Sequence, residues 1–184
     1  WTILLGEPAA VSLFYLTDEP DAGDLIAQRE VPVLPDDYSQ DLIARTNGVL
    51  KEVVRGLAPA IRSGVLPRTP QDPSQATYYA KRTPEDGIID WSRSTDAIYR
   101  LVRAVGRPYP GAFTWAAGNK LPVWRARPES AKRLSATERE RLAGEVLRVK
   151  SDGALVRTVD GGLWITEMVG SELRVAMRLG VGAS

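Results

Sequence analysis

Histidine and cysteine are both absent from this 184-residue sequence, and so are long apolar runs. Without histidine, the commonest general base and the commonest neutral metal ligand are missing, and these residues cannot build a Ser-His-Asp arrangement. Without cysteine there is no disulfide framework and no thiolate metal site, which fits a reducing compartment. No run approaches the roughly 20 apolar residues that span a bilayer. We therefore expect a cytoplasmic protein with no membrane partner and no bound metal.

An excess of charge of either sign is also lacking. The sequence has 24 Lys and Arg against 23 Asp and Glu, a net charge of +1, so no overall field attracts nucleic acid or an acidic membrane. Apolar residues make up 43% and charged residues 26% of the chain, as in an ordinary folded protein. The length suffices for one good core or two small ones, and disordered and fibrous classes are excluded.

The first part of the chain predicts strand, loop and strand. Apolar, β-branched and aromatic residues fill positions 10–16 and 25–33, and the turn-rich residues 17–24 separate them. Before them stands Trp1-Thr2-Ile3-Leu4-Leu5, without an initiator Met or a polar lead, as in the interior of a helix. We therefore expect further residues before Trp1 in the complete protein.

A helix is predicted next, because apolar residues recur at three- and four-residue steps from Leu42 to Ile61. Ser39 or Asp41 can cap its start, and Gly64 can end it. A single apolar stripe of this length suggests that the helix lies on one face of a sheet. Residues 67–77 then carry Pro, Gln, Asp and Ser with little apolar periodicity, which indicates a connection.

The remainder predicts a helix and then short strands with glycine-bearing turns. Residues 94–106 have apolar side chains on one side and end in glycine. The five expected strands are residues 113–117, 121–126, 144–150, 154–159 and 163–169. Five such strands suffice for a small barrel, which we expect to be OB-like. Residues 135–142 have some helical character, and residues 171–179 are expected to close the chain as a short helix.

Two stretches carry a resemblance to a known family. In the first, residues 11–14 lead into Asp21-Ala22-Gly23-Asp24, and a strand then runs to Gln28. The second runs from Ala76-Thr77-Tyr78-Tyr79-Ala80-Lys81-Arg82 through Ile89-Asp90-Trp91 to Pro108-Tyr109-Pro110-Gly111-Ala112-Phe113. In order and spacing they resemble the folate-dependent formyltransferases, which move a formyl group from N10-formyltetrahydrofolate onto an amine. The resemblance covers nearly the whole chain.

The resemblance implies an α/β fold in two parts. Residues 1–75 would be the C-terminal part of a Rossmann-like formyltransferase catalytic domain, residues 76–112 a connecting segment with a helix, and residues 113–184 an OB-like C-terminal domain. The N-terminal part of the catalytic domain, on the order of a hundred residues, would precede Trp1.

The resemblance also implies a site. The family uses Asn, His and Asp, of which only the Asp has a match here, at Asp21. The loop Thr17, Asp18, Glu19, Pro20 and Asp21 matches the place where the family binds the pterin of its co-substrate, N10-formyltetrahydrofolate. Such a reaction needs donors for the oxyanion of a tetrahedral intermediate and a group that takes a proton from the amine. Because the Asn and His are not among these 184 residues, we expect no turnover from this chain alone.

The acceptor is expected to be a small primary amine, on a nucleotide-linked amino sugar, in preference to tRNA. Residues 122–184 hold 11 Lys and Arg against 8 Asp and Glu, which is only mildly basic for an RNA-binding surface. The chain resembles both the methionyl-tRNA members of the family and those acting on UDP-4-amino-4-deoxy-L-arabinose, and methionyl-tRNA stays open as the alternative. A homodimer is also left open.

Structural interpretations compete with these functional ones. Asp-x-Gly-Asp is ordinary turn chemistry, so Asp21 on local sequence alone can be a turn carboxylate. Trp91, Trp115, Trp124 and Trp164 can form a stacking surface for nucleic acid, but tryptophans in strand segments are more often core residues. A hypothesis of another class is a non-catalytic OB-like binding module, which would explain the missing histidine.

Overall fold

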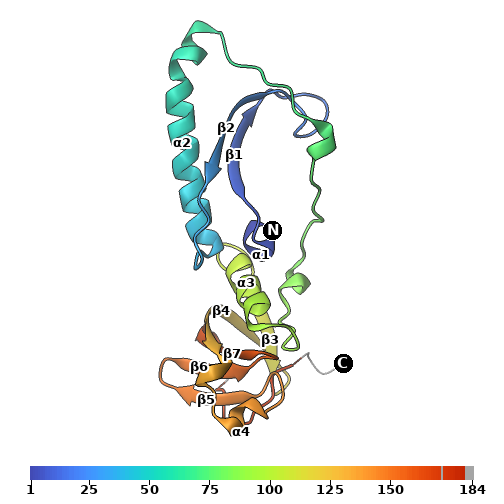
Figure 1. The fold of residues 1–184 in the computed structure, drawn as a ribbon, viewed down its shortest axis with the longest axis vertical. Helices are drawn as coiled ribbons and strands as arrows, with labels where there is room; N and C mark the ends of the chain where they lie inside the picture. The colour runs from blue at the N-terminus through green and yellow to red at the C-terminus, as the bar shows by residue number, and fades with distance from the viewer. Residues whose placement is uncertain (171, 181–184) are drawn as a thin grey trace.

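The computed structural model describes residues 1–170 and 172–180. The molecule is elongated, with an N-terminal module at one end and a C-terminal domain at the other (Figure 1). The N-terminal module contains helix α1 (Thr2–Leu5), strands β1 (Ala9–Phe14) and β2 (Leu25–Val31) and helix α2 (Ser39–Ser63). A connecting segment, residues 64–94, returns along the molecule and contains the short helices η1 (Pro73–Gln75) and η2 (Pro84–Gly87).

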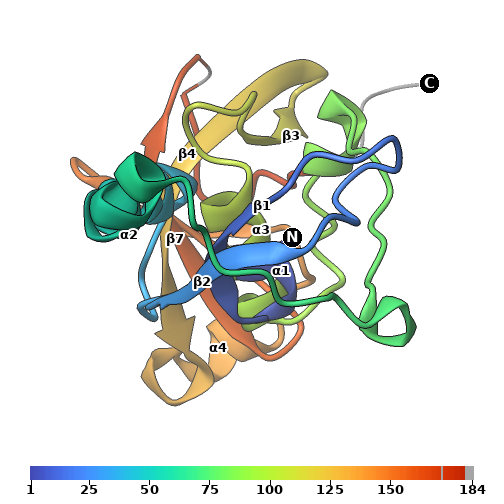
Figure 2. The same ribbon diagram turned by 90° about the horizontal axis from the view of Figure 1, so that it is seen from above.

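The expected strand, loop and strand at the start of the chain is confirmed. β1 and β2 pair antiparallel from Ala9 opposite Val31 to Phe14 opposite Leu25. Seen along the long axis, the two strands lie between α2 and the connecting segment (Figure 2). The first residues of the chain, whose sequence is like the interior of a helix, fold as the short helix α1. β1 and β2 therefore form a two-stranded hairpin with α2 on one side of it.

The α2 helix agrees closely with its predicted extent. It begins at Ser39 after Tyr38, whose backbone N–H donates to the Asp41 carboxylate over 2.9 Å. It ends at Ser63, and the following Gly64 adopts the left-handed conformation (φ +73°) and donates from its N–H to the carbonyl of Ile61. The acidic first turn and the glycine at the end are the features that stabilise helix termini.

The C-terminal domain is one antiparallel sheet with helices on it. The elements are α3 (Thr95–Ala104), β3 (Ala112–Ala116), β4 (Asn119–Ser130), η3 (Ala131–Arg133), α4 (Ala136–Arg139), β5 (Val146–Lys150), β6 (Gly153–Arg157) and β7 (Gly161–Met168). The strands have the order β3-β4-β7-β6-β5 in the sheet, and all five lie where the sequence predicts strands.

The expected OB-like barrel is wrong, because the sheet stays open. In the described part of the chain, the edge strands β3 and β5 form no ladder with each other. An extended C-terminal segment, residues 172–180, contacts both edges instead. Trp115 and Gly180 exchange backbone hydrogen bonds of 3.0 and 3.2 Å, and the N–H of Val146 donates to the carbonyl of Met177 over 2.8 Å. Single bridges of this kind cover the exposed strand edges without closing a barrel.

The expected C-terminal helix is also wrong. Residues 172–180 form no helix, and their turn has Ala176 in the left-handed region at φ +65°. Residue 171, the first of the predicted helix, lies outside the described residues. The backbone groups of this segment bond to β3 and to the residues beside β5, so the pairing with the sheet edges prevails over any local helical preference.

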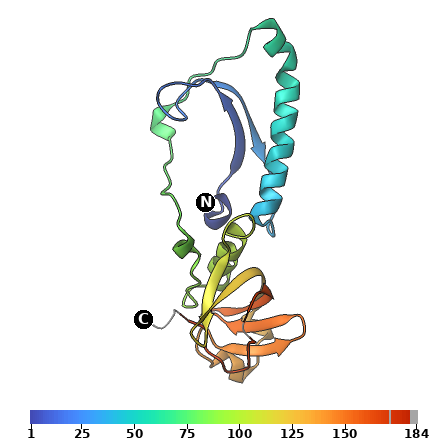
Figure 3. The same ribbon diagram turned by 180° about the vertical axis from the view of Figure 1, so that it is seen from behind.

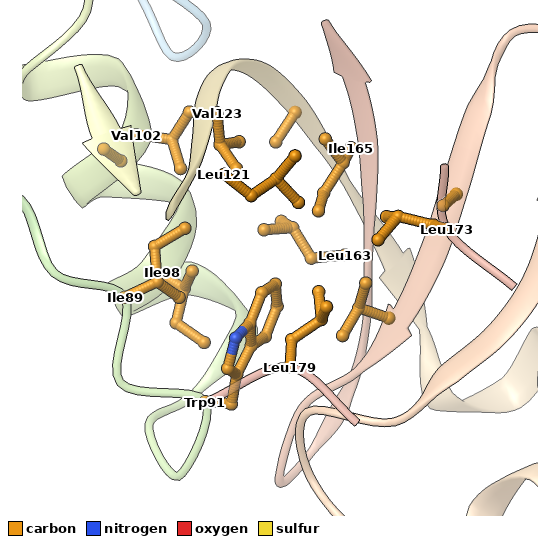
Figure 4. Close-up of a cluster of buried hydrophobic side chains, with 14 of the residues drawn as sticks. Ile89, Trp91, Ile98, Val102, Leu121, Val123, Leu163, Ile165, Leu173 and Leu179 are labelled. Carbon is orange, nitrogen blue, oxygen red and sulfur yellow. The ribbon is translucent and has the colours of Figure 1, made fainter. Parts of the chain in front are cut away.

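The hydrophobic core lies between α3 and the sheet (Figure 4). It is built from apolar side chains of α3, of the strands, of the connecting segment and of the C-terminal segment: Ile89, Trp91, Ile98, Val102, Leu121, Val123, Leu163, Ile165, Leu173 and Leu179. Trp91 and Trp164 are buried, which confirms the interpretation of these two tryptophans as core residues. The last part of the connecting segment therefore belongs physically to this domain.

Tyr38 joins the N-terminal module to this core. Its hydroxyl donates to the carbonyl of Ala126 over 3.1 Å and accepts from the N–H of Ala126 over 3.0 Å. Ala126 lies beside an irregularity in the pairing of β4 with β7. Ser39 adds a hydrogen bond to the carbonyl of Ala104 at 2.6 Å, and Arg103 donates to the carbonyl of Asp37 over 3.0 Å. The start of α2 is thus fixed to α3 and β4.

We predict that Tyr38→Phe lowers the free energy of unfolding by about 1–3 kcal/mol, because it leaves the buried N–H and carbonyl of Ala126 without partners. Urea unfolding followed by tryptophan fluorescence measures the change. Tyr109→Phe is the matched control, since Tyr109 is 51% exposed. Equal midpoints for the two variants would contradict the role assigned to Tyr38.

An ion pair attaches α4 to β5 on the other face of the sheet. Arg148 donates from Nε and Nη2 to the two carboxylate oxygens of Glu138, over 2.6 Å each, and the N–H of Ser135 also donates to Glu138 over 2.8 Å. The Arg148 guanidinium lowers the pKa of Glu138 to about 2. This pair lies beside a second apolar cluster, made of Leu134, Leu147, Leu155 and Trp164.

We predict that Glu138→Gln destabilises the fold at neutral pH and has a diminishing effect in acid. Because the folded-state pKa lies below the ordinary value of 4.5, the stabilisation is complete above pH 4.5 and is lost as the pH falls toward 2. Urea midpoints at pH 7, 4 and 2.5 test this, with Glu140→Gln, at the residue just after the same helix, as the control. A difference between wild type and variant that is constant across this range would contradict it.

Candidate active site

The loop between β1 and β2 carries all five residues that the sequence predicts for the site. Thr17, Asp18, Glu19, Pro20 and Asp21 form one exposed turn at the far end of the N-terminal module (Figure 1). The Thr17 hydroxyl donates to the carbonyl of Glu19 over 2.8 Å. Asp21 has φ +58°, in the left-handed region that non-glycine residues seldom adopt. The structure therefore brings these residues together, with the Asp21 side chain in solvent.

Gly23 lies where the two ends of this loop approach each other, beside Tyr15 and Asp24, a place that we call the neck of the loop. A Cβ atom at position 23 would lie 1.6 Å from the carbonyl oxygen of Tyr15, so no other residue fits without moving the backbone. The N–H of Tyr15 donates to the carbonyl of Asp24 over 3.0 Å, directly beside this contact. The glycine of the Asp-x-Gly-Asp motif therefore permits the close backbone approach on which the turn depends.

The connecting segment holds this neck from outside. Leu25 and Thr69 exchange two backbone hydrogen bonds, of 2.8 and 3.0 Å. The neighbouring Arg68 forms an ion pair with Asp24 at 3.1 Å, and its guanidinium lies 3.9 Å from the centre of the Tyr15 ring. Figures 1 and 3 both show the connecting segment running beside the loop. The segment that the sequence marks only as a connection is therefore part of the candidate site.

Gln71 reaches the loop itself. Its side-chain amide donates to the carbonyl of Asp21 over 2.8 Å and to the carbonyl of Gly23 over 2.6 Å. The next turn is fixed by Asp72, which accepts from the N–H and the hydroxyl of Ser74, and these bonds lower the pKa of Asp72. Sequence reasoning missed Gln71, because no local pattern relates it to a loop about fifty residues earlier in the chain.

The chemistry available at this loop is that of a carboxylate on a fixed backbone. Asp21 can accept a proton or orient an imidazole, but the chain supplies no histidine for it. In the described residues no group of histidine, cysteine, aspartate and glutamate is suited to hold a metal ion. Across residues 1–170 and 172–180, no helix combines the length and apolarity needed to cross a membrane. The loop is thus one component of a site.

A cavity of about 530 Å³ lies elsewhere, at the junction of the N-terminal module with the C-terminal domain. It is lined by apolar and polar residues of α1, α2, the connecting segment and the turn after α3, among them Ile3, Ser39, Leu42, Ile43, Lys81, Arg82, Val105 and Pro110. A second cavity of about 440 Å³ lies between β1 and α2. Neither is lined by residues 17–21, so these cavities do not enclose the predicted site residues.

Trp1, which borders the first cavity, packs against the connecting segment. Trp1 stacks on Tyr79 with ring centroids 5.3 Å apart, and its indole N–H donates to the carbonyl of Ala80 over 3.1 Å. The Tyr79 hydroxyl donates to the carboxylate of Glu7, and this bond raises the pKa of Tyr79. These contacts attach the connecting segment to the start of the chain, far along the segment from Gln71.

Residues 81–174, more than half of the chain, match the model of the formyl transferase C-terminal domain. HypX from Aquifex aeolicus is similar in structure, with 30% sequence identity and a TM-score of 0.72 for one variant. That match covers 91% of this chain and 29% of the HypX chain. HypX in complex with tetrahydrofolic acid matches with 29% identity and a TM-score of 0.71, over 91% of this chain and 28% of that one.

More distant structures share the fold. The N-formyltransferase from Helicobacter canadensis, in complex with folinic acid and dTDP-3-aminofucose, is 16% identical, with a TM-score of 0.67. The match covers 91% of this chain and 59% of that enzyme. Methionyl-tRNA formyltransferase from Clostridium thermocellum is 20% identical, with a TM-score of 0.56, over 68% of this chain and 54% of its own. Together with the family match, these likenesses mean that the chain belongs to the formyl transferase family and contains its C-terminal domain.

Proposed function

We propose that the complete protein transfers a formyl group from N10-formyltetrahydrofolate to a primary amine. The observation that carries the proposal is the β1–β2 loop, whose backbone is held by Gly23 and the connecting segment and which presents Asp21, the residue that matches the family's aspartate by sequence resemblance. The complex of HypX with tetrahydrofolic acid supports a folate co-substrate. The loop Thr17, Asp18, Glu19, Pro20 and Asp21 is proposed to contact the pterin.

The proposed reaction follows from the chemistry of an amide transfer. The amine nitrogen attacks the formyl carbon, a tetrahedral oxyanion forms, and the bond to N10 then breaks, which releases tetrahydrofolate. The amine loses one proton and N10 gains one, so the site must accept and return a proton. Asp21 would orient an imidazole and stabilise its protonated form, and an Asn amide and that imidazole would donate to the oxyanion. Residues outside these 184 would supply both groups.

We also propose the division into parts. Residues 1–75 would contribute the last strands and helix of a Rossmann-like catalytic domain, residues 76–112 would connect, and residues 113–184 would form the C-terminal domain. The family match begins at residue 81, and Ile89, Trp91 and α3 pack in the same core as the sheet, so this core also draws on part of the proposed connection.

The proposed acceptor is an amino sugar linked to a nucleotide. The Helicobacter canadensis enzyme, bound to dTDP-3-aminofucose, shares the fold and so makes such an acceptor compatible with it. The mild basicity of residues 122–184, 11 Lys and Arg against 8 Asp and Glu, favours a small acceptor over tRNA. The open sheet and the family match weigh against a non-catalytic OB-like module.

We predict that Asp21→Asn in the complete protein lowers kcat for formyl transfer by about 100-fold or more, since the amide can neither accept a proton nor stabilise an imidazolium. The measurement is release of tetrahydrofolate from N10-formyltetrahydrofolate with a saturating amine. Asp152→Asn, in the exposed turn between β5 and β6, is the control and should keep wild-type turnover. Circular dichroism should show both variants folded; a fully active Asp21→Asn would refute the assignment.

We predict the highest kcat/KM for a nucleotide-linked amino sugar when the complete protein is assayed against three classes of acceptor. The panel contains dTDP- and UDP-linked amino sugars, methionyl-tRNA and free amino acids. A tRNA acceptor would show a steep loss of kcat/KM with rising salt, because it binds through phosphates, whereas a nucleotide sugar would show a shallow one. Preference for methionyl-tRNA would overturn the proposed acceptor and keep the proposed reaction.

A further inference from the structure

We propose that Gln71 is a positioning residue that fixes the direction of the Asp21 carboxylate. The inference depends on the proposed function, because it gives Gln71 a role in the reaction through Asp21. It starts from the side chain of Gln71 in the connecting segment, which bonds to the backbone of Asp21 itself and of the residue two positions further on. The amide of Gln71 donates to the carbonyl oxygens of Asp21 and Gly23, over 2.8 and 2.6 Å.

Holding these two carbonyls fixes the backbone around Asp21. The direction of a carbonyl, for a given φ, sets ψ of its residue, so the Gln71 amide restrains ψ at positions 21 and 23 together. Asp21 has φ +58°, a conformation that an aspartate adopts at a cost and leaves readily when nothing opposes it. Because the Cα–Cβ bond turns with the backbone, a change at Asp21 would redirect its carboxylate.

The other contacts of the connecting segment act at a different place. At the neck of the loop, the backbone of Thr69 pairs with that of Leu25. Arg68 contacts Asp24 and the ring of Tyr15 there. Of the hydrogen bonds found in the described ranges, those of Gln71 alone reach residues 16–23 from outside the loop. The bonds of Tyr15 with Asp24 and of Leu25 with Thr69 can therefore remain without Gln71, while residues 16–23 lose their restraint from outside the loop.

The chemistry of glutamine suits this position. Its amide donates two hydrogen bonds and carries no charge, so it holds the backbone without adding a cation beside the carboxylate. A lysine or arginine here would attract the Asp21 carboxylate and compete with an imidazole for it. Gln71 therefore orients the backbone and leaves both carboxylate oxygens available for the reaction.

Backbone ¹⁵N relaxation tests the structural half of the inference. Gln71→Leu should lower the order parameters of residues 21–23 from those of a rigid backbone, about 0.85, toward the flexible range below about 0.6, because their carbonyls lose the partner that restrains them. The order parameters of Leu25 and Thr69 should be unchanged, since their mutual hydrogen bonds remain. The matched control is Gln75→Leu, which removes a similar amide from the same segment, where it bonds only to Asp72 at 3.2 Å. Equal order parameters at residues 21–23 in the two variants would overturn the inference.

Kinetics of the complete protein test the functional half. Gln71→Leu should lower kcat about tenfold or more, with the acceptor KM within about twofold of wild type, and Gln75→Leu should match wild type. The double variant Asp21→Asn/Gln71→Leu should be no slower than Asp21→Asn alone, because Gln71 acts through Asp21. Additive losses would overturn the positioning role. A wild-type protein without formyl transfer would refute the proposed function, and the relaxation result would still decide whether Gln71 holds the loop.

Discussion

Two backbone hydrogen bonds between Leu25 and Thr69 determine where the candidate site can be built. Backbone pairing fixes register independently of the side chains, so this bridge sets which residues of the connecting segment face the loop. Arg68 and Gln71 lie on either side of Thr69, and each contacts a different part of the loop. The same segment continues to Trp91, which is buried in the core of the C-terminal domain. The loop is thus linked to that core through an extended chain.

The N-terminal module needs such links because it has little core of its own. Its buried apolar residues are few, whereas the main apolar cluster draws only Tyr38 from this part of the chain. Polar and backbone contacts therefore determine the position of α2 and of the β1–β2 hairpin relative to the C-terminal domain. Asp37 illustrates this, because the Arg45 guanidinium lowers its pKa while its carbonyl accepts from Arg103. At this junction several hydrogen-bonding groups must find their partners at the same time. This requirement fixes how the N-terminal module is oriented against the C-terminal domain.

Local patterns predicted the elements well, and failed where distant segments compete. The α2 periodicity, Gly64 and the glycine-bearing turns between strands are local signals, and the structure confirms the helix and all five strands. The residues expected to form a closing helix are held by the two sheet edges instead, and this pairing depends on where β3 and β5 end in space. The same limit explains Gln71: a connection rich in Pro and Asp contains no sign that one amide reaches a loop in another part of the chain. For the site, the sequence indicated the loop residues only through family resemblance.

Asp21 combines a strained backbone with a free side chain, and the two features belong together. In the described structure its carboxylate makes no hydrogen bond within the chain, while its carbonyl is held by Gln71. A carboxylate that bonded to its own loop would be well placed but occupied, and an imidazole would have to displace that partner. Holding the backbone avoids this competition, because the direction of the side chain is set before any partner arrives. Left-handed conformations at non-glycine residues persist only where the surroundings enforce them, and Gly23, Gln71 and the Leu25–Thr69 bridge provide that enforcement here.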